Sequence, residues 1–241
     1  MLTYIMLFVS VMLVIIYIFI EIKGRPLFAI FFKGLASFSF ILVFVFALFE
    51  KIFFENSIFY LGSSFYSYVP VLMIILLGLI AGLIGDLFLA LRPLQDLVED
   101  QNIIISGIVC FSVGHLFYFT AFMMMTTFSW LSVIIAVVMT IVIYFMSDKL
   151  DYRMGKAKTP TLIYSFLIFL MVGQTLGFAI ITGFSTFSMM FLVGALLFSI
   201  SDLILAPIYY GNGNRPMMVI MNLITYYSAQ ILIAVSILFL V

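Results

Sequence analysis

The sequence predicts an all-α, polytopic membrane helix bundle with eight transmembrane helices, and two observations support this prediction. Of the 241 residues, 66% are hydrophobic and only 8% are charged, whereas soluble globular domains carry about 25% charged residues. Runs of about 18 or more mostly apolar residues are long enough to cross a bilayer as helices. Eight such runs occur, at 2–20, 33–50, 70–92, 103–126, 128–146, 160–182, 186–208 and 218–240.

The eight runs occupy nearly the whole chain, so we treat residues 1–241 as a single integral-membrane domain. The first run lacks a basic leading segment and a small-residue cleavage site, which favours a retained span over a signal peptide. The short connections between spans are typical of a protein of the bacterial plasma membrane, and this is the membrane that we expect.

Several classes of function are disfavoured by composition. The formal net charge is zero, so the chain lacks the basic surface that nucleic-acid binding requires. Cys110 is the single cysteine, and it lies within a span. With one cysteine and one histidine, a zinc site of the usual type is not expected, and the sequence calls for no metal or organic cofactor. The oligomeric state leaves no signature in the sequence.

The basic residues predict the orientation in the membrane. Lys51 is the single basic residue in the connections that follow spans 2, 4 and 6. The other nine lie in or beside the connections after spans 1, 3, 5 and 7: Lys23, Arg25, Lys33, Arg92, Lys149, Arg153, Lys156, Lys158 and Arg215. Because cytoplasmic loops carry an excess of lysine and arginine, this second set is predicted to be cytoplasmic and both termini to face outward.

Two aspartates, Asp86 and Asp202, lie inside runs that are otherwise typical of membrane spans. A carboxylate at such depth costs about 2.5–3.5 kcal/mol to insert and is usually functional. Both begin the phrase Asp-Leu-x-Leu-Ala, and they are 116 residues and four spans apart. The two spans therefore run in the same direction, and a direct repeat of residues 1–126 and 127–241 as two four-helix halves is one interpretation.

Further polar residues fall in the same half of the predicted bundle. Asn222, Tyr226 and Gln230 are spaced by four residues and so share one helical face. His115 lies near the middle of its span, with Tyr118 about one turn further on. Such residues either bind a substrate or join neighbouring helices by hydrogen bonds. We expect the buried polar groups to share one cavity in the cytoplasmic half.

Lys33 opens the second predicted span. Its simplest role is that of an interfacial anchor whose ammonium reaches the membrane surface, and the sequence alone favours this role. The alternative is a contact with the phosphate of a lipid headgroup.

Two carboxylates that lie close together in a low-dielectric environment do not both ionise readily, so a protonated acid can stand beside a charged base. Such a pair suits the hydrolysis of an acid-labile bond, because one group donates a proton while the other activates water. The structural alternative is that Asp86 and Asp202 only hydrogen-bond to neighbouring helices and hold the bundle together.

Four short motifs occur in order along the chain: Gly85-Asp86, Gly114-His115 with Tyr118, Gly194-Ala195 leading to Ser201-Asp202, and Tyr226-Tyr227-x-x-Gln230. This ordered set resembles the YhhN family of integral-membrane lysoplasmalogenases. Lys33-Gly34-Leu35 is similar to a Lys-Pro-Leu element of the family, with glycine in place of proline. The resemblance implies hydrolysis of the vinyl-ether bond of a lysoplasmalogen to a fatty aldehyde and glycerophosphoethanolamine or glycerophosphocholine.

Under this resemblance Asp86 and Asp202 are the expected catalytic residues. The expected partner is a lysophospholipid substrate taken from the surrounding membrane lipid. The expected substrate-binding residues are Lys33, His115, Tyr118, Asn222, Tyr226 and Gln230.

Two alternatives from other functional classes remain. Paired intramembrane aspartates and a repeat also suit a proton-coupled transporter of small molecules or lipids. A non-catalytic lipid-binding membrane protein is the second alternative, and in it the loss of either aspartate would change stability alone.

The orientation can be checked with reporter fusions. A reporter enzyme that is active only in the cytoplasm should be inactive when fused after Val241, because the basic connections place the C-terminus outside. The same reporter inserted between Asp151 and Lys158 should be active and serves as the control. An active C-terminal fusion would contradict the predicted orientation.

Overall fold

The computed structural model describes residues 2–53, 62–94, 97–211 and 215–240. All eight predicted spans are helices long and apolar enough to cross a membrane, which confirms a multi-pass helical bundle. Their bounds are α1 Leu2–Ile22, α2 Pro26–Phe53, α3 Gly62–Ala90, α4 Leu97–Met125, α5 Trp130–Lys149, α6 Lys158–Ile181, α7 Thr186–Tyr210 and α8 Pro216–Ser236. Three single 3₁₀ turns accompany them, at Arg92–Leu94, Gly155–Ala157 and Ile237–Phe239.

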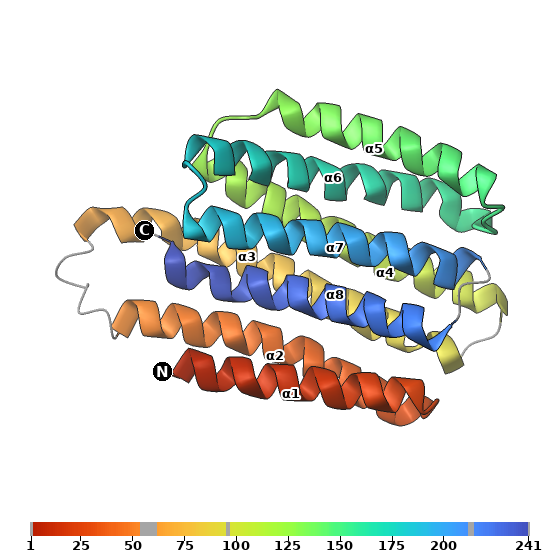
Figure 1. Ribbon diagram of the computed structural model, residues 1–241. Helices are drawn as coiled ribbons and strands as arrows, with labels where there is room; N and C mark the ends of the chain where they lie inside the picture. The colour runs from red at the N-terminus through yellow and green to blue at the C-terminus, as the bar shows by residue number, and fades with distance from the viewer. Residues whose placement is uncertain (1, 54–61, 95–96, 212–214, 241) are drawn as a thin grey trace.

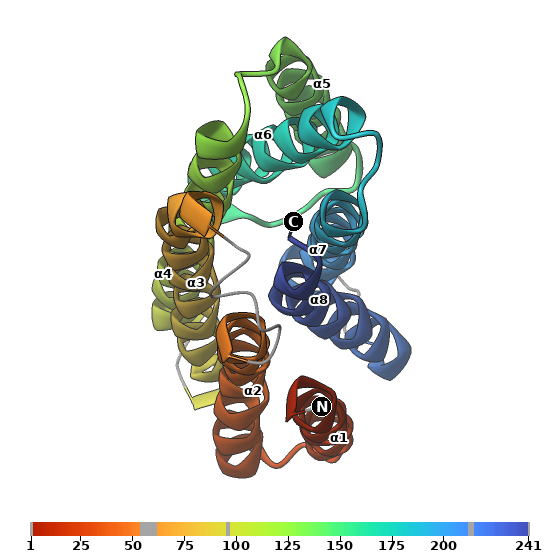
Figure 2. The same cartoon turned by 90° about the vertical axis from the view of Figure 1, so that its left-hand side faces the viewer.

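Six of the helices form a closed ring in cross-section. Around this ring α2 contacts α3, α3 contacts α4, α4 contacts α6, α6 contacts α7, α7 contacts α8, and α8 returns to α2. The other two helices pack on the outside, α1 against α2 and α8, and α5 against α6 (Figure 2). Each half of the chain thus supplies one outer helix and three ring helices. That is the arrangement a direct repeat would produce, and the repeat itself stays a prediction.

The connections alternate between the two ends of the bundle. Those after α1, α3, α5 and α7 lie at one end, and both chain termini lie at the other (Figure 1). The nine basic residues assigned to these connections therefore belong to a single end. Helices α3 and α7 run in the same direction, as their separation by four spans predicts. Which membrane face the basic end occupies stays a prediction.

Helix α2 begins earlier than the sequence predicts. The apolar run predicts a span at 33–50, whereas the helix extends from Pro26 to Phe53. Proline is suited to the first turn of a helix, where its missing N–H has no intrahelical partner. Lys33 consequently lies about two turns inside the helix instead of opening it, and this changes its role.

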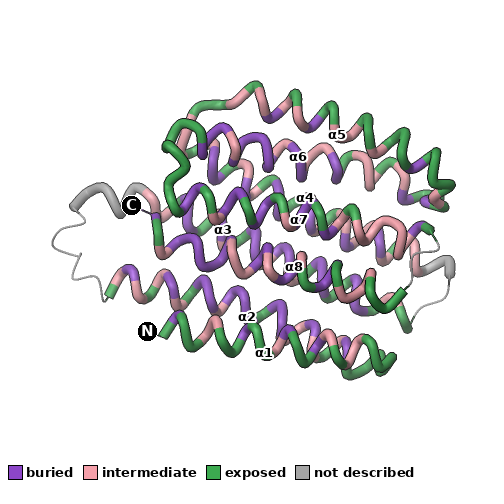
Figure 3. The backbone as a smooth tube through the Cα atoms, in the orientation of Figure 1, coloured by how far each residue is buried: buried purple, intermediate pink, exposed green. Residues whose placement is uncertain are grey.

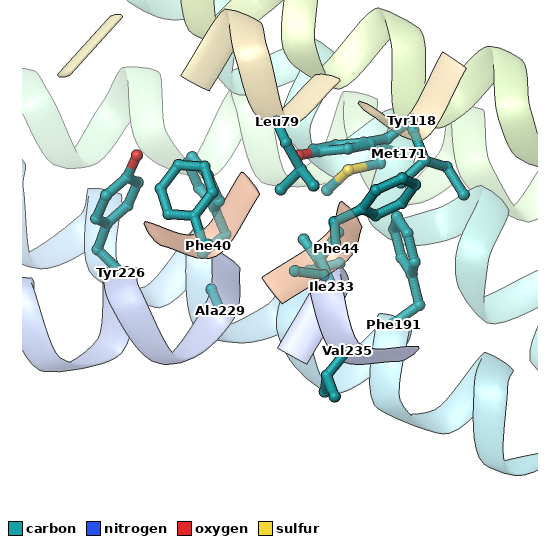
Figure 4. Packing of buried hydrophobic residues seen from close by; sticks show 14 of the residues in the cluster. Phe40, Phe44, Leu79, Tyr118, Met171, Phe191, Tyr226, Ala229, Ile233 and Val235 are labelled. Atoms are coloured by element: carbon teal, nitrogen blue, oxygen red, sulfur yellow. The ribbon is translucent and has the colours of Figure 1, made fainter. Parts of the chain in front are cut away.

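The outer helices α1 and α5 are less buried than the helices of the ring. Only 17% of the α1 and α5 spans is buried, compared with 67% of the span containing α6, and the outward faces of α1 and α5 are exposed along their length (Figure 3). The ring interior is filled by large side chains such as Phe40 and Phe44 of α2 and Phe191 of α7 (Figure 4). The outer helices thus present exposed apolar faces, while the polar residues described below are enclosed by the six ring helices.

Small residues allow the helices to approach closely. A Cβ atom on Gly194 of α7 would lie 3.0 Å from the carbonyl oxygen of Ala229 in α8. A Cβ atom on Gly173 of α6 would clash with the Cα atom of Ser132 in α5. Membrane helices associate largely through such close packing, because lipid tails are as apolar as the helix surfaces.

We expect Gly173→Ala to destabilise the protein by about 1–3 kcal/mol, the usual cost of overpacking, because the new methyl group meets backbone that cannot rotate away. Thermal unfolding in detergent would measure the effect. Ile180→Val is a matched control on the same helix, since Ile180 is 54% exposed, and it should leave the melting temperature unchanged. Equal melting temperatures for Gly173→Ala and the wild type would contradict the close α5–α6 contact.

Candidate functional site

Asp86 is buried inside the ring, near the basic end of α3, and is 2% exposed. Ser37 of α2 donates a hydrogen bond to its Oδ2 at 2.7 Å, and the hydroxyl of Tyr226 in α8 donates to the same oxygen at 2.5 Å. Lys33 Nζ lies 3.6 Å from the other carboxylate oxygen, Oδ1. The ammonium group and the two hydroxyl donors favour the charged form of this carboxylate and oppose the cost of burying it.

Lys33 is therefore not the interfacial anchor that the sequence favoured. Its side chain is only 11% exposed and lies beside Asp86, about two turns inside the longer α2 helix. Burying an unpaired ammonium group is costly, and pairing with a carboxylate offsets that cost. Lys33 also lines a cavity, so the predicted phosphate contact is compatible with its position.

Asp202 has different surroundings. The hydroxyl of Tyr164 in α6 donates a hydrogen bond to Asp202 Oδ2. The same hydroxyl lies 3.3 Å from His115 Nε2 of α4. His115 is 1% exposed, and its other ring nitrogen, Nδ1, finds no hydrogen-bond partner among the described residues. Tyr164 thus links the histidine to the aspartate.

Tyr164 is the main residue that the sequence interpretation missed. It belongs to no motif singled out there, and its span, 160–182, contains no charged residue. The available signal was a tyrosine about one turn inside an apolar run. A single tyrosine hydroxyl is too common in membrane helices to select it without the tertiary contacts.

The predicted polar face of α8 reaches Asp86. Gln230 Nε2 donates to the Tyr226 hydroxyl at 3.2 Å, and the Tyr118 hydroxyl donates to Gln230 Oε1 at 3.4 Å. Asn222 is oriented differently, because its Nδ2 donates to the carbonyl oxygen of Ser201 at 2.7 Å. Asn222 therefore fixes the backbone next to Asp202, and Tyr226, Gln230 and Tyr118 form a hydrogen-bonded chain that ends on Asp86.

Aromatic rings fill the space between the two groups. The ring of Phe198 packs edge-on against His115 at a centroid distance of 4.7 Å and against Tyr226 at 5.3 Å. Phe111 packs against both Phe198 and Tyr226. All eight predicted site residues thus lie in one region of the ring interior, and Phe198 separates the Tyr226–Asp86 group from the His115–Tyr164–Asp202 group.

Two cavities open beside these groups, whereas the sequence interpretation expected one. The polar cavity, of about 550 Å³, contains Glu21, Lys33, Arg92, Asp100 and Asn222 in its wall. The apolar cavity, of about 460 Å³, lies among α4, α5, α6 and α7. Its wall is formed mainly by aliphatic and aromatic side chains such as Ile104, Met139, Ile143 and Ile168, together with Asp202 and Tyr164.

The cavities adjoin at a partition formed by Leu89, Leu205 and Tyr209, which line both. The expectation of one shared cavity is wrong because these large side chains divide the space. Among the described residues, Asp202 faces the apolar cavity directly, and Asp86 contacts the polar cavity through Lys33. One side of the partition therefore suits charged groups and the other a hydrocarbon chain.

The site can accordingly hold an amphipathic molecule and exchange protons with it. One carboxyl group faces hydrocarbon with a single hydroxyl donor, and the other is held by an ammonium and two hydroxyls. Environments that differ in this way separate an acid from a charged carboxylate. No group of three or more His, Cys, Asp or Glu side chains that could hold a metal ion is found within the described part of the chain.

Comparison with known protein families gives one result. A model of the YhhN family matches residues 28–237, which is most of the chain and includes every site residue named so far except Glu21. No curated protein matches the chain, and no solved structure does.

The ion pair can be tested by a double-mutant cycle. Lys33→Met should lower the free energy of unfolding by about 3–5 kcal/mol, because it leaves the buried Asp86 carboxylate without its counter-charge. Adding Asp86→Asn should recover most of that loss, since the remaining amide is neutral. Thermal unfolding of the three variants in detergent measures the coupling. Additive effects of the two substitutions would show that Lys33 and Asp86 do not interact.

Proposed function

Because the chain belongs to the YhhN family, we propose that it hydrolyses the vinyl-ether bond of a lysoplasmalogen. The observation that best supports the proposal is the partition, where a polar and an apolar cavity adjoin beside the buried Asp86 and the partly buried Asp202. A single-chain lipid has a charged headgroup and one hydrocarbon chain. With the headgroup in the polar cavity and the chain in the apolar cavity, the bond between them lies near the partition.

The reaction needs only proton transfers and one water molecule. A proton adds to the β-carbon of the vinyl ether, and the α-carbon and ether oxygen then share the positive charge as an oxocarbenium ion. Water attacks the α-carbon and loses a proton, which gives a hemiacetal. The bond between that carbon and the ether oxygen breaks as the hemiacetal proton moves to the ether oxygen. The products are a fatty aldehyde and a free glycerol hydroxyl.

We assign the proton-donating role to Asp202. It faces the apolar cavity, where the chain and its double bond would lie, and Tyr164 holds its carboxyl group in place. After donating its proton, the Asp202 carboxylate can accept one from the attacking water, so the residue returns to its initial state. General acid–base catalysis of this kind typically contributes about 10²–10⁴-fold.

We assign a different role to Asp86. It is held as a carboxylate by Lys33, Ser37 and Tyr226, and the resulting negative charge lies inside a low-dielectric bundle. A fixed charge in such a site stabilises an oxocarbenium ion without having to reorganise during the reaction. The Tyr226 hydroxyl and its partner Gln230 keep this carboxylate oriented.

We expect Asp86→Asn and Asp202→Asn each to reduce aldehyde release by at least about 10²-fold, because each removes a group that acts in the transition state. The measurement uses purified protein, lysoplasmenylethanolamine and a coupled aldehyde reductase. Asp148→Asn is the matched control, since Asp148 is exposed, pairs with Lys158 and lines neither cavity.

The double variant Lys33→Met with Asp86→Asn separates chemistry from folding, because it should be stable and still inactive. Wild-type turnover by either single aspartate variant would overturn the roles assigned here. A substrate-dependent pH change in sealed vesicles, with no aldehyde formed, would instead favour proton-coupled transport. If neutralising the aspartates changed stability alone, a non-catalytic lipid-binding protein would be the better interpretation.

A further inference from the structure

The polar cavity has an uneven distribution of charge. Four charged side chains that the structure describes line it: Glu21 of α1, Lys33 of α2, Arg92 after α3, and Asp100 of α4. Two of them are paired with each other, because Arg92 Nε and Nη2 bind the two carboxylate oxygens of Asp100 at 2.6 and 2.8 Å. Lys33 is paired with Asp86, outside the cavity wall. Glu21 forms no ion pair with any described residue.

The uncompensated charge on the described part of the cavity wall is therefore negative. Arg92 does not neutralise this negative charge, because its guanidinium group is bound to Asp100 and also stacks over the ring of the partition residue Tyr209 at 3.9 Å. Lys33 differs from Arg92, since its ammonium is 3.6 Å from one Asp86 oxygen, which is a long contact. Lys33 can thus bind a second anionic oxygen from the cavity side while it remains close to Asp86.

Glu21 is suitably placed for a role in binding. It lies in the last turn of α1, at the end of the bundle where the connections after α1, α3, α5 and α7 gather (Figure 1). This end is where the headgroup of a membrane lipid would enter. Glu21 also precedes the region matched by the family model, residues 28–237, so the family match says nothing of it. The hydroxyl-bearing ring of Tyr17, one turn before Glu21, lines the same cavity.

We propose that Glu21 binds the cationic amine of a zwitterionic lysophospholipid headgroup, with the adjacent phosphate directed toward Lys33. The inference rests on the proposed function for the identity of the lipid, and it adds the residue that selects its headgroup. Two opposite charges on one wall, Lys33 and Glu21, match the two opposite charges of the ligand. A headgroup with a phosphate and no amine would place its negative charge near Glu21 without compensation, and such a mismatch disfavours the wrong ligand.

The test compares two lipids, one with and one without the ethanolamine group. The ligands are 1-O-alkyl-glycero-3-phosphoethanolamine and 1-O-alkyl-glycero-3-phosphate, whose saturated ether bond lacks the double bond that the proposed reaction protonates. Their affinities for the full-length protein in detergent are measured by thermal stabilisation. We expect Glu21→Gln to weaken binding of the ethanolamine lipid by about tenfold, the size of one charge-assisted hydrogen bond, and to leave binding of the phosphate lipid unchanged or tighter.

Asp148→Asn is again the control, because it removes a negative charge at the same end of the bundle away from both cavities, and it should alter neither affinity. Equal weakening of both lipids by Glu21→Gln, or no weakening of either, would overturn the inference. The matching kinetic test uses the vinyl-ether forms of the two lipids, where Glu21→Gln should raise KM for the ethanolamine substrate and leave kcat unchanged.

The two proposals fail in different ways. If no aldehyde is formed from either vinyl-ether lipid but Glu21→Gln still removes the preference for the amine, the proposed function fails and the headgroup site stands. If aldehyde is formed and Glu21→Gln keeps the wild-type preference, the hydrolase stands and the headgroup site fails.

Discussion

An ammonium group and a carboxylate meet inside the helix ring, and the rest of the site depends on this contact. Lys33 Nζ of α2 lies 3.6 Å from Asp86 Oδ1 of α3, and both side chains are largely buried. Either charge alone would be expensive in the interior of a membrane protein. Together with the hydroxyls of Ser37 and Tyr226, they form a compensated group that fixes the relative positions of α2, α3 and α8.

That fixed group accounts for the difference between the two aspartates. Asp86 is surrounded by donors, whereas Asp202 has one described hydrogen-bond donor, Tyr164, and faces hydrocarbon. The same residue type in the same local phrase thus has two electrostatic environments. A reaction that needs a proton donor and a fixed negative charge can use two aspartates in such different surroundings. The surroundings of each carboxyl group, and not its residue type, then determine which role it takes.

Side-chain packing also divides the space inside the bundle into two cavities. Phe198 packs between His115 and Tyr226, and Leu89, Leu205 and Tyr209 separate the two cavities. Because Arg92 is bound to Asp100 and stacked on Tyr209, the partition is connected to the charged end of the bundle. Binding of a headgroup beside Arg92 and of a chain beside Leu205 would therefore act on the same small set of side chains.

The amino-acid sequence by itself determined the eight spans, the grouping of basic connections at one end, the common direction of α3 and α7, and Asp86 and Asp202 as the residues to examine. These features depend on local composition and on the high cost of charge in lipid, and both are readable along the chain. Only the tertiary structure decided that Lys33 pairs with Asp86, that Tyr164 joins His115 to Asp202, and that two cavities replace one. Each of these depends on side chains from different helices meeting at particular distances, and the pattern of a single helix does not record which neighbour its side chains will face.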